Sequence, residues 1–187
     1  MSSRVRFTVD DLELTPDDGS RYEIIDGDLY VSTQPQWQHQ FVAARIDRQF
    51  ALWDPGDHQG VCIPAPGLVF ARDEAVAPDL VWISREHLHR VVEPRGRLQA
   101  APDLVVEILS PGQANVERDR GLKLKLYSRY GVREYWIVDW PDQVIQVYRH
   151  RDGALEVAAT LSGTDQLTSP LLPGFSCSVG EICTLPL

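Results

Sequence analysis

The sequence is short of basic charge and of long apolar runs, and each shortage argues against a class of protein. Its 18 lysines and arginines are outnumbered by 27 acidic residues, which gives a formal net charge of −9 over 187 residues. This balance argues against unspecific nucleic-acid binding, because phosphate affinity comes mainly from clustered positive charge, so any DNA contact must use a local basic patch. No uncharged apolar run approaches the ~18 residues of a membrane helix, and no segment of signal-peptide length follows Met1. We therefore expect a soluble, cytoplasmic protein with no membrane partner.

Cysteine is also scarce. Cys62, Cys177 and Cys183 are an odd number, and their spacing matches neither a metal-binding nor a redox motif. We expect them to be reduced thiols that fill the core of a cytosolic protein. With 43% hydrophobic and 24% charged residues, and no repeat or low-complexity tract, the chain is long enough for one well-buried core. A single domain over residues 1–187 is the expectation.

Two acidic strands are the most informative feature that the sequence does have. Asp79 immediately precedes an apolar run over residues 80–83, and Glu107 lies inside a second apolar run that follows Asp103 and extends to Leu109. An ionised carboxylate in a buried strand is costly unless a partner or a cation compensates it. Two such strands therefore make a divalent-metal site the first hypothesis.

The hydrophobic pattern of the first half predicts helices and strands in mixed order. We expect a short helix from about residue 8 or 10 and a hairpin over residues 22–31, with Asp26 and Gly27 in its turn. Val42, Ile46 and Phe50 lie on one stripe of a helix over residues 36–53. Residues 60–71 contain two prolines and predict one irregular or edge strand. A buried strand over residues 80–83 follows.

The second half predicts a strand–helix–strand unit. Residues 85–100, which include Arg95, have little apolar periodicity and indicate an exposed helix-and-loop insertion. A helix from residue 115 or 117 to residue 130, closed by Gly131, joins the strand at 103–109 to a strand at 134–140, which implies a parallel crossover. Strands at 144–148 and 154–161 add antiparallel pairs. The fold class is therefore α/β, with a central mixed β-sheet flanked by helices and an extra N-terminal β-hairpin.

A dimer is a further expectation from the C-terminal strands. Their apolar side chains indicate an edge that could pair with a second subunit, and these are Trp136, Trp140, Val144, Ile145 and Tyr148. A homodimer would also suit an enzyme that cuts both strands of a duplex.

The acidic residues and one lysine predict the site. Glu23 on an early strand, Asp79 and Glu107 supply hard oxygen ligands that suit Mg²⁺ or Mn²⁺. Such a cation lowers the pKa of a bound water and neutralises charge on a phosphate. Lys123 would then steady the water or the phosphoryl oxygens.

The helix period predicts which of two lysines faces the carboxylates. Asp119, Lys123 and Tyr127 lie four residues apart and share one helix face. Lys125 points roughly 200° away from Lys123, at about 100° per residue. Only one of these two lysines can therefore face the carboxylates.

Each candidate also has a plainer interpretation. Asp79 could cap a turn after Pro78, Glu107 could simply pair with Lys123, and Glu23 could face solvent beside Arg21. His39 is expected to position the site rather than act as a general base. Tyr127 and Trp136 are most simply core aromatics. The basic residues of the third helix could form a DNA-facing patch, or they could form a solvated face whose positive charge is partly offset by nearby acidic residues. The basic residues concerned are Arg118, Arg120, Lys123, Lys125 and Arg129.

Motifs along nearly the whole chain resemble the Uma-type restriction endonucleases of the PD-(D/E)XK nuclease superfamily. They are Tyr22-Glu23-Ile24-Ile25-Asp26-Gly27, His39, Pro78-Asp79, Val106-Glu107-Ile108-Leu109-Ser110-Pro111, the Asp119, Lys123 and Tyr127 spacing, Gly131-Val132-Arg133-Glu134-Tyr135-Trp136, and Leu172-Pro173-Gly174.

The resemblance implies a restriction-endonuclease-like core, a Mg²⁺ or Mn²⁺ site, and hydrolysis of DNA phosphodiester bonds by metal-activated water. It carries Asp79, Glu107 and the main-chain carbonyl of Ile108 onto the ligand positions. The chain departs from the superfamily pattern at one place, because Leu109 occupies the usual lysine position. The family resembles a migrated-lysine variant, so Lys123 would take that role.

Two functions of different classes follow. The first is a metal-dependent endonuclease, with Asp79, Glu107, Lys123 and Glu23 as its catalytic residues. The second is a catalytically silent module of the same fold that binds or regulates, alone or as a dimer, since the chain is acidic and has no long basic arm. Metal-dependent hydrolysis of a smaller phosphate ester would use the same site.

Overall fold

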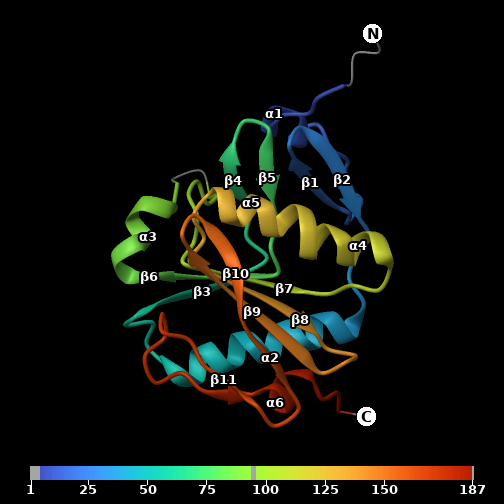
Figure 1. Cartoon of the computed structure of the whole chain (residues 1–187). Helices are drawn as coiled ribbons and strands as arrows, with labels where there is room; N and C mark the ends of the chain where they lie inside the picture. Colours follow the sequence, from blue (N-terminus) through green and yellow to red (C-terminus); the bar gives the residue numbers. More distant parts are fainter. Residues whose placement is uncertain (1–4, 94–95, 187) are drawn as a thin grey trace.

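A computed structural model describes residues 5–93 and 96–186 of the chain. The strands are β1 (Arg21–Ile25), β2 (Asp28–Ser32), β3 (Gly60–Pro64), β4 (Leu68–Ala71), β5 (Glu74–Val76), β6 (Leu80–Ser84), β7 (Leu104–Ile108), β8 (Glu134–Asp139), β9 (Val144–Arg151), β10 (Ala154–Ser162), β11 (Gln166–Leu167) and β12 (Cys177–Ser178). The helices are α1 (Val9–Leu12), α2 (Trp37–Trp53), α3 (Arg85–Val91), α4 (Gln113–Glu117), the π-helical turn η1 (Arg118–Lys123), α5 (Leu124–Arg129) and α6 (Val179–Cys183). Figure 1 shows their arrangement.

A six-stranded mixed sheet forms the centre of the fold, in the order β10-β9-β8-β7-β6-β3. Strands β7 and β8 are parallel, and the other neighbours are antiparallel. The parallel pair is joined by the α4, η1 and α5 helix, which is the crossover expected from the sequence. The predicted central mixed sheet flanked by helices is therefore confirmed.

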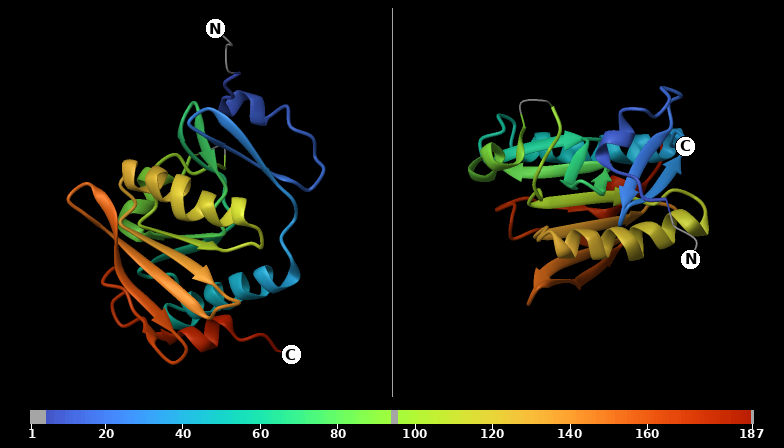
Figure 2. Two further views of the ribbon diagram at one scale, coloured as in Figure 1. Left: turned by 45° about the vertical axis from the view of Figure 1, so that its right-hand side comes forward. Right: turned by 90° about the horizontal axis from the view of Figure 1, so that it is seen from above.

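Helices cover both faces of this sheet (Figure 2). On β7, Val106 and Ile108 pack into the cluster that contains the apolar face of α2, whereas Val105 packs with Tyr127 of α5 in the opposite cluster. Because strand side chains alternate between faces, Glu107 shares the face of Val105. Alternation along β7 therefore points Glu107 toward the α5 side.

A second, four-stranded sheet lies beside the first, in the order β2-β1-β5-β4. It contains the predicted hairpin, and Asp26 and Gly27 take positive φ values of 51° and 73° in its two-residue turn. The single strand predicted over residues 60–71 is wrong, since β3 belongs to the large sheet and β4 to the small one. Pro64, Pro66 and Gly67 break the chain between them, and the three-residue β5 was not predicted.

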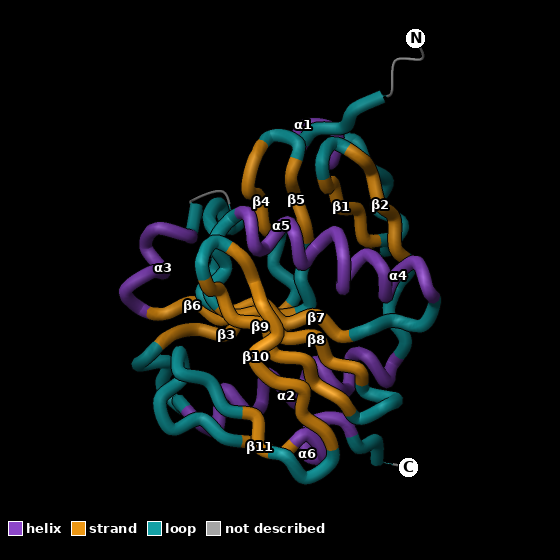
Figure 3. The backbone as a smooth tube through the Cα atoms, viewed as in Figure 1, coloured by secondary structure: helices purple, strands orange, loops and turns teal. Residues whose placement is uncertain are grey.

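The crossover helix is not a uniform α-helix. Its path is continuous (Figure 3), but its middle, Arg118–Lys123, is a π-helical turn. The helix ends at Arg129, and Gly131 follows with φ of 77°, as expected of a C-terminal capping glycine. The predicted end is within one residue, whereas the helix begins at Gln113, before the predicted start at residue 115 or 117, and its π-helical middle was not predicted.

The segment 85–100 is less exposed than the sequence indicated. Ser84 caps α3 by accepting a hydrogen bond from the backbone N–H of His87. Val91 and Leu98 are buried against the α5 side of the sheet, so the prediction of an exposed insertion is wrong at these positions. Residues 94–95, with Arg95, lie outside the described residues.

The predicted dimer edge lies inside the sheet. Strands β8 and β9 each have two neighbours, and β10 is the outer strand. Trp136, Ile145 and Tyr148 are buried in the core. The surface proposed for a homodimer is therefore wrong, and the homodimer itself stays a prediction without that surface.

The three cysteines are free thiols, as expected, with Cys177 and Cys183 buried and Cys62 half-buried. Within the described ranges, no helix is both long and apolar enough to cross a membrane.

Candidate active site

The two acidic strands meet side by side. Strands β6 and β7 pair antiparallel with Leu80 opposite Val106. Asp79, just before β6, therefore lies beside the end of β7, and its Oδ2 accepts a hydrogen bond of 2.8 Å from the backbone N–H of Ile108. The structure thus brings Asp79 next to Glu107 and the Ile108 main chain, as the sequence predicted.

Asp79 is buried and held by donors from three directions. Besides the Ile108 amide, Arg21 Nη1 donates to Oδ1 at 2.9 Å, and His39 Nε2 lies 3.1 Å from Oδ2. Burial alone would raise the pKa of Asp79, but His39, Arg21 and the Ile108 amide outweigh it and lower the pKa to about 2. Asp79 is therefore a fixed anion at neutral pH. His39, predicted to support the site, contacts it through this carboxylate.

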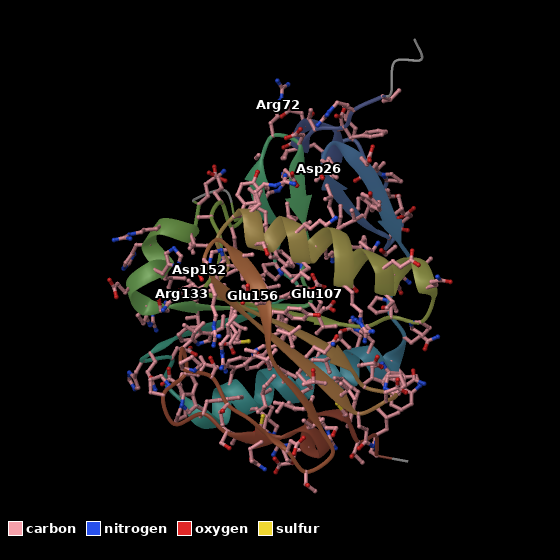
Figure 4. The ribbon with its side chains drawn as sticks, in the orientation of Figure 1. Asp26, Arg72, Glu107, Arg133, Asp152 and Glu156 are labelled. Carbon is pink, nitrogen blue, oxygen red and sulfur yellow. The ribbon has the colours of Figure 1, made fainter. Side chains whose placement is uncertain are left out.

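Glu107 is buried on the α5 side of the sheet (Figure 4). Lys123 Nζ lies 2.9 Å from its Oε1, and the Tyr127 hydroxyl donates to the same oxygen at 2.7 Å. Burial raises the pKa of Glu107 to about 8, with Asp79, Asp119 and Glu23 adding to the rise and Lys123 opposing it. Glu107 therefore retains a proton far more readily than Asp79, and Tyr127 is a site residue as well as a core aromatic.

Glu23 and Asp119 complete an acidic cluster around Lys123. Glu23 Oε1 lies 3.0 Å from Lys123 Nζ and accepts a hydrogen bond of 3.0 Å from the Ala77 amide. Glu23 is fully buried, so the solvent-facing alternative is wrong. Asp119 Oδ1 lies 3.6 Å from Lys123 Nζ, and burial raises its pKa.

The predicted choice between the two lysines is confirmed by their positions. Lys123 is buried among the carboxylates, and Lys125 is exposed. Burial disfavours the charge on Lys123, but Glu107, Glu23 and Asp119 outweigh burial and raise its pKa. Lys123 is therefore a permanent cation that holds Glu107 and Glu23 together.

Two arginines lie in the site: Arg21 was not predicted there, and Arg118 was expected only as part of a possible DNA-facing patch on the helix. Arg21 contacts Asp79, and Arg118 lies with its Nε 3.9 Å from both Glu23 Oε2 and Asp119 Oδ1. Arg21 lies two residues before Glu23 on β1, and strand alternation alone could have placed both on one face. Arg118 had no such signal, because an α-helical period does not bring it to the face of Lys123.

A cavity of about 30 Å³ lies among these side chains. Its lining includes Asp79, Glu107, Ile108, His39, Asp119 and Lys123. Since one water needs roughly 10–15 Å³ of such space, the cavity can hold about two water-sized species. This is room for a small cation and a water, and too little for a phosphate group.

The donor set fits a hard divalent cation. Asp79, Glu107 and the Ile108 main chain line the cavity, and Lys123 and Tyr127 both bond to Oε1 of Glu107 rather than to Oε2. Four buried carboxylates, Asp79, Glu107, Glu23 and Asp119, share three cations, Arg21, Arg118 and Lys123, so loss of the Glu107 proton adds a negative charge that a metal ion could balance. Over the described residues, no three His, Cys, Asp or Glu side chains form a ready metal cluster. Mg²⁺ commonly binds through only one or two carboxylates and keeps several of its waters, so Asp79 and Glu107 are enough to bind it.

Comparisons with known proteins identify the family and the fold of the chain. The sequence model of the Uma2 family, described as "Putative restriction endonuclease", matches residues 9–180. No curated protein sequence matches the chain significantly. The fold is similar to the crystal structure of "a putative nuclease belonging to DUF820" from Anabaena variabilis ATCC 29413, with a TM-score of 0.74, 19% identity, and coverage of 94% of this chain and 97% of that chain. A match over this much of the sequence identifies the family, and the chain belongs to the Uma2 family.

Proposed function

We propose that the protein is a metal-dependent endonuclease that hydrolyses phosphodiester bonds of DNA with a metal-activated water. The observation that carries this proposal is the meeting of Asp79 and Glu107 at a small cavity, with Lys123 Nζ 2.9 Å from Glu107. Two carboxylates with sharply different pKa values at one cavity are typical of functional sites. Family membership supports a nuclease activity.

Asp79, Glu107 and the main-chain carbonyl of Ile108 would hold Mg²⁺ or Mn²⁺. When bound, the ion would supply a water of lowered pKa and positive charge to offset the charge that develops on the phosphate. The raised pKa of Glu107 supports this assignment, because a cation at the site replaces the proton that Glu107 otherwise keeps.

The surrounding residues would position these ligands. Arg21 and His39 fix the Asp79 carboxylate in one orientation, and Tyr127 does the same for Glu107. Lys123, pinned by Glu107, Glu23 and Asp119, would place its ammonium group where it can orient the attacking water or contact the phosphate.

DNA cleavage tests the proposal directly. Supercoiled, linear and single-stranded DNA would be incubated with the protein and Mg²⁺ or Mn²⁺. We expect cleavage by the wild type, and losses in Asp79→Asn and Glu107→Gln that exceed the ~10–100-fold typical of residues that only support metal ligands.

Asp103→Asn is a matched control for these variants. Asp103 is also a buried carboxylate next to β7, but it lies at the other end of the strand and bonds to Ser84 and Arg133. Its loss should lower stability without lowering the cleavage rate of the folded protein. Equal cleavage by wild type, Asp79→Asn and Glu107→Gln would contradict the proposal.

A catalytically silent module is the second candidate. It is favoured by the number of protein donors that Asp79 and Glu107 already have, since the site forms a closed network of hydrogen bonds and ion pairs. Calorimetry with Mn²⁺ separates the two functions. Binding that is lost in Asp79→Asn supports the nuclease, and the lack of any binding at millimolar Mn²⁺ supports the module.

A further inference from the structure

A second, larger cavity adjoins the proposed metal site. Its volume is about 300 Å³, against about 30 Å³ for the first. The two cavities share part of their lining, and the shared residues are Ser32, Thr33, Pro35, Ser110 and Arg118. The larger cavity therefore opens onto the same place where the carboxylates meet.

The two cavities would receive different parts of the substrate. The smaller cavity has room for a cation and a water, whereas the larger one reaches the size of a small-molecule site. A phosphate attacked from the smaller cavity must therefore lie at the boundary that both share. The larger cavity then lies next to the nucleotide that carries this phosphate.

The lining of the larger cavity suits a nucleotide better than it suits an ion or an apolar ligand. Its described lining carries amide and hydroxyl groups, and these come from Ser32, Thr33, Gln34, Gln36, Ser110 and Asn115. Such groups both donate and accept hydrogen bonds, as the edges of a base require. Arg118 is the one charged residue among the described residues that line it.

Arg118 lies at the boundary of the two cavities and has one buried donor without a hydrogen-bond partner. Its side chain is 12% exposed, and its Nη1 donates to the Ser32 hydroxyl at 2.9 Å. Its buried Nε has no hydrogen-bond partner among the described residues, because Glu23 and Asp119 lie 3.9 Å away, beyond hydrogen-bond reach. A planar guanidinium binds phosphate oxygens through two donors at once.

We propose that the cavity lined by Gln34, Gln36, Asn115 and Arg118 binds one unstacked nucleotide of a DNA strand, with Arg118 on the phosphate at the boundary of the two cavities. This inference rests on the proposed nuclease function and adds the form of the substrate. A base enters such a cavity only after it leaves its stack, which requires a base pair to open in a duplex and none to open in a single strand. The protein therefore prefers single-stranded or locally opened DNA.

Binding measured by fluorescence anisotropy tests this without requiring cleavage. A labelled single-stranded oligonucleotide and its matched duplex would be titrated with the protein in millimolar Ca²⁺, and gels would verify that the DNA stays intact. We expect tighter binding of the single strand. Arg118→Ala should weaken that binding about tenfold or more and lower the slope of log affinity against log salt by about one.

Matched variants separate the cavity from general effects of charge and bulk. Thr33 is exposed and lines both cavities, so Thr33→Trp should fill the space and weaken binding even if Arg118→Ala perturbs the fold. Arg120→Ala removes the same charge from a residue paired with Asp139, and Ala44→Trp adds the same bulk at an exposed position of α2. Both controls should bind as the wild type does.

The outcomes distinguish this inference from the proposed function. Wild-type affinity in Arg118→Ala and Thr33→Trp, or equal affinity of the wild type for duplex and single strand, would overturn the nucleotide cavity. Cleavage that is unaffected by both variants would overturn it too and leave the nuclease standing. The expected binding pattern without any cleavage would support the cavity and remove the nuclease activity.

Discussion

Asp79 and Glu107 lie on neighbouring strands, yet their surroundings move their pKa values in opposite directions. Asp79 receives donors from Arg21, His39 and a backbone amide, which lower its pKa to about 2. Glu107 is buried near three other carboxylates, which raise its pKa to about 8 despite Lys123. Local donors and burial, and not the residue types, therefore decide which acid stays charged.

The raised pKa of Glu107 predicts how stability depends on pH. Its pKa rises from 4.5 in the unfolded chain to about 8 in the folded protein, so the folded state binds the proton more tightly. The resulting stabilisation is complete below pH 4.5 and is lost as the pH rises through 8. Between these values the free energy of unfolding in EDTA should fall by up to about 1.4 kcal/mol per pH unit.

Urea denaturation between pH 5 and 8 measures this slope. Glu107→Gln should flatten it relative to the wild type, because the amide does not titrate. Glu117→Gln removes an exposed carboxylate of α4 and should keep the wild-type slope. An identical slope in wild type and Glu107→Gln would show that Glu107 titrates normally.

Lys123 should matter for both stability and activity. Lys123→Met leaves Glu107 and Glu23 buried without their shared cation, and breaking such a buried pair costs about 3–5 kcal/mol. Lys125→Met, at the exposed position two residues later, should stay within about 0.5 kcal/mol of the wild type. Urea denaturation and DNA nicking rates, compared for the two variants, test this. Similar behaviour of the two would remove Lys123 from the site.

The residues of the site were largely predictable, and the exceptions have a physical reason. Apolar flanks marked Asp79 and Glu107 as acids in buried strands. Glu23 was predicted as a site residue with a solvent-facing alternative, and Arg21 was not predicted, because charged residues on a hairpin usually face solvent. Only the packing of the small sheet against the crossover helix buries them, and the sequence does not show that packing.

At the level of elements, the π-helical turn assembles the basic side of the site. A π-helix bonds residues five apart, and this turn spans Arg118 to Lys123, which both line the smaller cavity, whereas an α-helix would place them on different faces. The α-helical period correctly grouped Lys123 with Asp119 and Tyr127. It missed Arg118, because nothing in the sequence marks where the helix widens.

Gly121 lies within this turn and offers a test of its tolerance. A Cβ added at Gly121 would meet no atom within 4 Å. Gly121→Ala should therefore stabilise the protein by roughly 0.5–1 kcal/mol in urea denaturation, because alanine loses less backbone entropy in a helix. Cleavage should be unchanged.

Gly60 gives the contrasting result. A Cβ at Gly60 would overlap the Trp82 ring and the Ile83 carbonyl oxygen across the β3–β6 pair. Gly60→Ala should cost about 1–3 kcal/mol through overpacking. Destabilisation by Gly121→Ala of the same size would indicate that the π-helical turn cannot accept a better helix former.

Other elements show where sequence patterns are sufficient. Helix α2 was predicted from Val42, Ile46 and Phe50, which are all buried on one stripe. The parallel crossover followed from the length of the strand–helix–strand unit. The assignment of β3 and β4 to different sheets could not be predicted, because prolines indicate where a strand breaks and not the direction that the chain takes afterward.

Over the whole molecule, the charge pattern restrains DNA binding. Much of the basic charge of the crossover helix is neutralised internally, with Arg120 paired to Asp139 and Arg129 to Asp26 and Glu74. A broad DNA-binding patch on this helix is therefore not formed. With a net charge of −9, the proposed DNA binding would depend on the few cations at the site, and a bound divalent cation would reduce the repulsion.

A crystal soaked in Mn²⁺ and measured at a wavelength where manganese scatters anomalously tests the central claim most directly. We predict an anomalous peak in contact with the carboxylates of Asp79 and Glu107, close to the Ile108 carbonyl, and no such peak in crystals of Asp79→Asn. Wild-type crystals that show no peak there, or a peak only elsewhere on the surface, would contradict the claim that these two acids hold a divalent cation.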